Sequence, residues 1–149
     1  MSLRFRTKVF GASLGVAAAA LLLATLIIAW ELRDDERASI EQQLHGQALL
    51  IAELLARNPK MTGPGIDAEA DRLATGIGVR VTLIQRDGSV VGDSSVDGQT
   101  LAALDNHLNR PEVQLARDGQ VAIVERYSTT VQADMVYAAV AASHPQIAY

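Results

Sequence analysis

The stretch Arg80-Val-Thr-Leu-Ile-Gln-Arg-Asp-Gly-Ser-Val-Val-Gly-Asp93 decides the fold that we predict for this chain of 149 residues. Two short runs rich in β-branched residues flank Asp87-Gly88, and glycine adopts the positive φ of a tight turn without steric cost. The pattern predicts an antiparallel hairpin. Val79, Val81 and Leu83 would point to one face of it, because successive side chains of a strand point to opposite faces.

Two later runs, Val121 to Ser128 and Met135 to Ala142, predict a second antiparallel pair. The segment between the pairs is polar and helix-forming. Thr100 is the expected N-cap of a helix from Leu101 to His107, and a second helix is expected from Pro111 to Arg117. Strand, strand, helical insert, strand, strand is the order of a PAS-like sensor sheet, so we predict the α+β class.

The N-terminal part of the chain has the composition of a membrane helix. Residues 9–30 contain no charge, and as a helix they would extend about 33 Å, enough to cross a hydrocarbon core of about 30 Å. Arg4, Arg6 and Lys8 precede this run, so residues 1–8 are expected as a cytoplasmic tail, with all that follows Trp30 outside the membrane. The alternative is a cleaved signal peptide.

Charge and cysteine content exclude several classes of protein. The net charge is −4 for the whole chain and −7 for residues 31–149, which lack the three N-terminal cations. An acidic domain argues against nucleic acid as a partner, because binding requires a basic face. The chain has no cysteine, which excludes disulfides and thiolate metal sites.

Residues 31–58 are expected to form an amphipathic helix outside the membrane, ending at Asn58-Pro59. Its apolar positions recur every three or four residues: Ile40, Leu44, Ala48, Ile51 and Leu55. This stripe would pack against the sheet of the same chain, pair with a second copy in a parallel dimer that transmits signals, or do both at different positions. A short helix is expected from Ile66 to Thr75, within a sensor domain that covers residues 59–149.

The polar residues of the insert and strands are the candidates for a site. Arg110 and Arg126 carry guanidinium groups that suit a carboxylate or a phosphate, or that form internal ion pairs with Asp93 or Glu112. His107 lies near these acids in the sequence, but no second histidine has metal-ligand spacing, so we expect a hydrogen-bonded structural histidine. The predicted ligand-binding or structural cluster is Asp93, Asn106, His107, Arg110, Glu112, Arg126 and Tyr137. We predict no catalytic residue, metal or cofactor.

The chain resembles the N-terminal, extracytoplasmic part of membrane sensor histidine kinases, close to the phosphate-regulon sensor type. The residues that carry the resemblance are Arg80-Val-Thr-Leu-Ile, Asp87-Gly-Ser-Val-Val-Gly-Asp93-Ser94, Asn106-His107-x-Asn109-Arg110-Pro111-Glu112-Val113, Arg126-Tyr127-Ser128 and Met135-Val-Tyr137-Ala-Ala-Val.

The resemblance implies a PAS-like domain (PDC or Cache type) in a homodimer at the inner membrane of a bacterium. It implies that a small molecule or an envelope protein outside regulates a cytoplasmic kinase core, which would use ATP and Mg²⁺ and phosphorylate a response regulator. That core and a second membrane helix are not in the sequence, so we expect a fragment whose final strand begins at Gln146-Ile-Ala-Tyr149 and is incomplete. The alternatives are an envelope interaction domain, or the input domain of a chemoreceptor or a cyclic-dinucleotide enzyme.

Overall fold

The computed structural model describes residues 2–96, 98–128 and 132–149, and the side chains of these except residues 2–4 and 32–35. Met1, the side chain of Arg4 and Asp97 therefore lie outside the described residues. The chain divides into two compact units, Met1–Ile40 and Glu41–Tyr149. We consider each unit by itself.

The first unit is helical and apolar. It belongs to helix α1, which runs from Ser2 to Ala56 and ends just before Asn58-Pro59, as predicted. Among the described residues, α1 is the one helix that is long and apolar enough to cross a membrane. Its large apolar side chains between residues 5 and 30 are exposed, with Trp30 at 76%.

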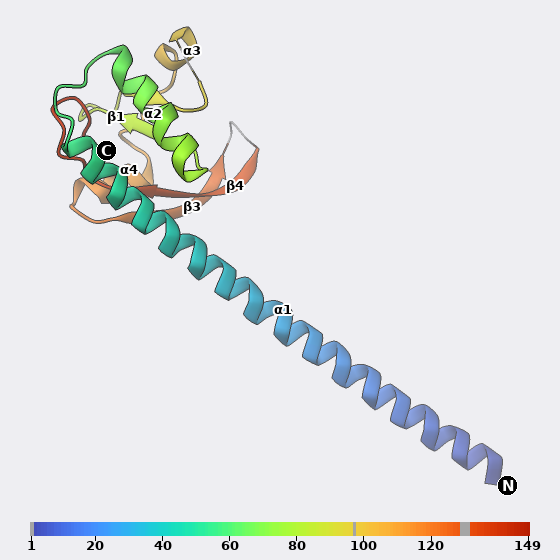
Figure 1. Cartoon of the computed structure of the whole chain (residues 1–149). Coiled ribbons are helices and arrows are strands. Elements are labelled where there is room, and N and C mark those ends of the chain that lie inside the picture. The colour runs from blue at the N-terminus through green and yellow to red at the C-terminus, as the bar shows by residue number, and fades with distance from the viewer. Residues whose placement is uncertain (1, 97, 129–131) are drawn as a thin grey trace. The chain divides into compact units, whose positions relative to one another are not determined.

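The second unit is a mixed α+β domain, as predicted. Its elements are α2 (Pro64–Ile77), β1 (Thr82–Ile84), β2 (Val90–Asp93), α3 (Gly98–Ala102), α4 (Pro111–Arg117), β3 (Ala122–Ser128) and β4 (Ala133–Ala139). The strands form two antiparallel pairs, β1 with β2 and β3 with β4. Helix α2 packs on the first pair and α4 on the second (Figure 1).

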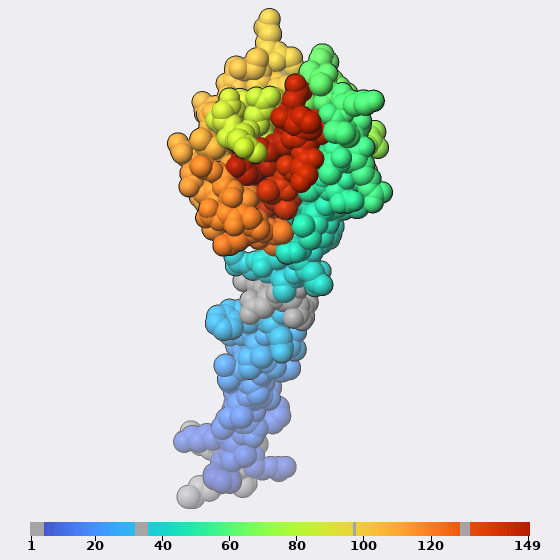
Figure 2. Space-filling view, turned by 90° about the vertical axis from the view of Figure 1, so that its left-hand side faces the viewer, coloured from blue at the N-terminus to red at the C-terminus, as the bar shows by residue number. Residues whose placement is uncertain are grey.

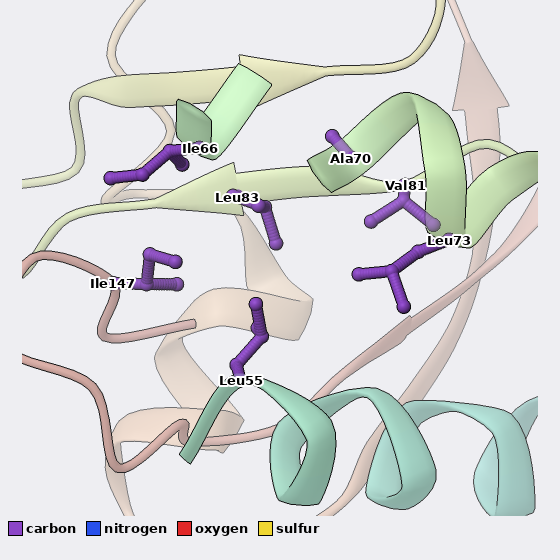
Figure 3. Close-up of a cluster of buried hydrophobic side chains, with 7 residues drawn as sticks. All are labelled: Leu55, Ile66, Ala70, Leu73, Val81, Leu83 and Ile147. Atoms are coloured by element: carbon purple, nitrogen blue, oxygen red, sulfur yellow. The ribbon is translucent and has the colours of Figure 1, made fainter. Parts of the chain in front are cut away.

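The core of this unit collects aliphatic side chains from four places in the sequence. Figure 3 shows Leu55 at the end of α1 pointing towards Leu83 of the first hairpin, with Ile147 of the C-terminal segment beside them and Val81 next to Leu73. Ile66, Ala70 and Leu73 of α2 complete the cluster. Burial of each large aliphatic side chain contributes about 1.5–3 kcal/mol, so α2 and the last turn of α1 are held to the hairpin mainly by these contacts.

Helix α2 is longer than the predicted Ile66–Thr75 because its ends are stabilised by the backbone. Pro64 stands in the first turn, where a missing N–H is tolerated. At the other end Gly78 has a φ of 73°, and its N–H donates to the carbonyl of Ala74. This left-handed glycine cap lets the helix continue through Ile77 before the chain turns into β1.

The predicted helix from Leu101 to His107 is wrong. Helix α3 ends at Ala102, and Thr100 lies inside it instead of at its start. The segment that follows is held to the first hairpin: the Asn106 side chain donates to the carbonyl of Asp87 at 2.8 Å, and the His107 N–H donates to that of Gly88 at 2.8 Å. These tertiary bonds replace the helical ones.

Gly88 is required where the hairpin turn meets this segment. Its φ is 88°, and a Cβ atom there would overlap the Asn106 side chain and lie 2.6 Å from the Leu108 backbone nitrogen. Gly119 has a similar φ of 79° but nothing within 4 Å of a Cβ atom. The two glycines share a backbone conformation and differ in their surroundings.

We expect Gly88→Ala to lower the free energy of unfolding by about 2 kcal/mol or more, through the left-handed φ and the steric overlap together. Gly119→Ala, the control, meets only the φ penalty of about 1 kcal/mol. Urea denaturation of both variants in detergent, followed by circular dichroism, checks this. Equal losses would contradict the close contact with Asn106.

Candidate functional site

Asp93, at the end of β2, is fully buried, and its carboxylate accepts hydrogen bonds from three other described residues. Arg80 donates to both of its carboxylate oxygens, with Nη2 at 2.8 Å from Oδ2 and Nε at 2.9 Å from Oδ1. The hydroxyl of Thr82, its partner across the hairpin, donates at 2.7 Å, and the Ser95 N–H donates at 2.9 Å. The Asp93 N–H donates to Asp67 of α2, so this residue joins the hairpin to that helix.

Glu112 and Arg126 form a second ion pair, which joins α4 to β3. Glu112 is only 4% exposed, and Arg126 donates to it from Nη2 at 2.6 Å and from Nε at 3.1 Å. The Arg126 guanidinium lies 3.7 Å from the centre of the Tyr137 ring, a cation–π contact between neighbouring strands. The hydrogen bonds to Glu112 raise the pKa of Arg126 above its ordinary value.

Arg110 stands just before α4 and differs from the other two arginines. Its side chain is half-buried, yet it makes no hydrogen bond or ion pair to any described residue. Burial lowers the pKa of Arg110, and the positive charge of Arg126 lowers it further, against the attraction of Glu112. The guanidinium of Arg110 therefore lies near a second cation without an acceptor of its own.

His107 is 2% exposed, and its Nδ1 atom has no hydrogen-bond partner among the described residues. Burial lowers the pKa of His107, and the charge of Arg110 lowers it further, while a hydrogen bond to the backbone of Asp105 acts in the opposite direction. The ring is thus held neutral beside a cation. Neighbouring Asn106 contacts the hairpin turn through its amide.

The predicted ion pair is confirmed for Arg126 with Glu112 and is wrong for the other candidates. Asp93 pairs with Arg80, which is not among the predicted site residues. The signal was present, since a turn centred on residues 87 and 88 places Thr82 opposite Asp93 and brings Arg80 near it. Arg110 stands just before α4. It does not pair with Glu112 of that helix, because Arg126 already binds the Glu112 carboxylate.

The stripe on α1 divides between the core and the surface. Leu55 is 2% exposed within the core, and Ile51 packs partly against it, as the intramolecular interpretation predicts. Leu44 is half-buried, whereas Ile40 is 49% exposed.

The described residues include no group of three or more His, Asp or Glu side chains placed to hold a metal ion. An open pocket of about 710 Å³ lies apart from the predicted cluster, between the turn at residues 85–87, the end of α4 and the C-terminal segment. Figure 2 shows that segment in red on the surface, beside the orange part of the chain that follows α3. What the polar cluster offers chemically is guanidinium groups, which bind oxyanions.

We expect Glu112→Gln to lower the free energy of unfolding by about 2 kcal/mol. The substitution removes the buried negative charge that pairs with Arg126, so the guanidinium of Arg126 stays positively charged without a carboxylate partner. Glu53→Gln is the matched control. Its partner Arg57 is bound at 3.1 Å, but both side chains are more than 60% exposed, so the loss should stay below about 1 kcal/mol. Urea denaturation measures both losses, and similar values would show that the Glu112 pair has no special weight.

His107 should make stability depend on pH. Its pKa is lower in the folded chain than the ordinary value of 6.5, so the unfolded chain takes up a proton first as the pH falls. Stability should therefore decrease from about pH 7.5 to about pH 5.5, and His107→Gln should reduce that slope. His45→Gln replaces an exposed histidine and serves as the control. Thermal unfolding measured at several pH values across this range tests the prediction. Parallel slopes of stability against pH for wild type and His107→Gln would refute the assignment of the pH dependence to His107.

Comparison with protein-family models and with curated proteins finds no match to this chain.

Proposed function

We propose that the chain is the signal-input module of a membrane sensor histidine kinase, with an extracytoplasmic PAS-like domain that regulates a cytoplasmic kinase core. The observation that carries the proposal is the course of α1. The helix that contains the apolar run also places Leu55 in the core of the α+β domain. A change in that core would therefore act directly on a helix suited to the membrane.

The course of the C-terminal segment supports the PAS-like assignment. The Ala142 N–H donates to the Ala148 carbonyl at 2.9 Å, which folds the segment back on the residues after β4. Tyr149 and Ile84 of β1 exchange both of their backbone hydrogen bonds, at 2.9 and 3.1 Å. The segment thus bonds to β1 and to the residues that follow β4, which is what we expect of the last strand in the proposed PAS-like sheet.

The exposed face of α1 supports a homodimer. With Ile51 and Leu55 directed to the core, another row is spaced alternately three and four residues apart: Ile40, Gln43, Gln47, Leu50 and Leu54. Gln47 is partly buried and its side chain donates to the Ile77 carbonyl of α2, whereas the other four residues are exposed. Leu50 is 53% exposed and Leu54 37% exposed. A three–four spacing with apolar members is the pattern of a parallel coiled-coil seam, here between two copies of the chain.

A single cysteine tests this seam cleanly, because the chain has none of its own. We expect Leu54→Cys to form a disulfide between two copies in membranes under mild oxidation, since paired seam positions bring Cα atoms within about 7 Å. Leu49→Cys is the matched control, an exposed leucine on another side of the same helix. Non-reducing electrophoresis gives the yield of dimer, and cross-linking at Leu49 but not at Leu54 would exclude the proposed seam.

The same variants test the input role when the chain is joined through a second membrane helix to a histidine kinase core. Oxidation of the Leu54→Cys hybrid should change its autophosphorylation with ATP and Mg²⁺, whereas the Leu49→Cys hybrid should respond much less. A cross-linked seam with unchanged autophosphorylation would leave a dimeric envelope protein without an input role.

A further inference from the structure

We infer that Arg110, together with Arg126, forms a binding site for a small oxyanion, a carboxylate or a phosphate. The inference deepens the proposed sensory function and rests on it for its biological role. Binding itself can be measured without any kinase core, so the two proposals can fail separately.

The charges around Arg110 leave one positive charge without compensation. Three guanidinium groups, those of Arg80, Arg110 and Arg126, act on this region, and the two buried carboxylates are Asp93 and Glu112. Each carboxylate is already bound by another arginine, Asp93 by Arg80 and Glu112 by Arg126. His107 is held neutral. The excess charge lies on Arg110, which has no acceptor among the described residues.

The partial burial of Arg110 makes its uncompensated positive charge evidence for a bound anion. A fully exposed arginine without a partner is common, because water satisfies its donors. Arg110 is half-buried and lies near the like charge of Arg126, and both factors oppose its cationic form. An anion beside both groups would reverse these effects.

The neighbouring groups favour an oxyanion over a halide. Arg126 is oriented by Glu112 and by the ring of Tyr137, and it uses Nε and Nη2 for Glu112. Arg110 offers a complete planar fork, which matches the two oxygens of a carboxylate or phosphate group. A single excess charge fits a monoanion, such as a monocarboxylate or singly ionised phosphate.

The test is thermal unfolding of the full chain in detergent at constant ionic strength, with sodium acetate or sodium phosphate replacing sodium chloride. We expect Tm to rise with one or both oxyanions, on the order of 5 °C at about ten times the Kd. A response to acetate alone identifies a carboxylate site, and a response to phosphate alone identifies a phosphate site. Equal melting in all three salts would overturn the proposal.

Two variants locate the response. Arg110→Gln should weaken oxyanion binding at least tenfold by calorimetry, yet unfold at the same or a higher temperature in chloride, because it removes a half-buried cation near Arg126. Arg117→Gln removes the same charge from an exposed position on α4 and should keep the full response. If Arg110→Gln does not fold, Arg110→Lys keeps the charge and removes the planar fork, and it too should weaken binding. An undiminished response in the folded Arg110 variant would overturn the assignment.

Discussion

Asp93 is a carboxylate at a position with no exposure to solvent, and much of the domain is arranged to neutralise it. A buried charge is tolerated only when it is paired and hydrogen-bonded, so the hairpin has to bring Arg80 and Thr82 to it, and the turn after β2 has to present the Ser95 N–H. The Asp93 backbone in turn binds Asp67 of α2. Asp93 thus contributes both to the pairing of β1 with β2 and to the docking of α2, in addition to the aliphatic contacts of the core.

Glu112 repeats this arrangement on the other half of the domain, where Arg126 joins α4 to β3. In both pairs a buried acid on one element meets an arginine from another, which specifies a contact more narrowly than aliphatic packing does. The two pairs use two of the three arginines in the region. The third, Arg110, has no carboxylate partner among the described residues, because both buried carboxylates are already bound by the other two arginines.

Helix α1 contains both the apolar run suited to a membrane and a last turn that packs in the core of the α+β domain. Leu55 and Ile51 anchor the end of α1 in the core, while Leu50 and Leu54 remain exposed on another side of the same turns. In the proposed dimer, a helix with one face in the domain and another face against the second copy would transmit a small shift of the domain to the dimer axis. An oxyanion near Arg110 would act at α4 and β3, on the sheet pair farther along the chain from α1.

The sequence by itself determined the elements that depend on local pattern. The Asp87-Gly88 turn, the apolar run of residues 9–30, the end of α1 before Pro59 and helix α4 at Pro111 follow from composition, periodicity and the fixed φ of proline. Its alternation also placed Val81 and Leu83 in the core.

Only the tertiary structure decided which partners these elements meet. Residues 101–107 have a helical pattern, but Asn106 and His107 bind the turn at Gly88 instead, because hydrogen bonds to another segment compete directly with those of a helix. The choice of Arg80 for Asp93, and the isolation of Arg110, likewise depend on distances across the folded chain. Spacing along a sequence names the groups that can pair, but close approach in three dimensions selects the pairs that form, since these charge-assisted hydrogen bonds extend only about 3 Å.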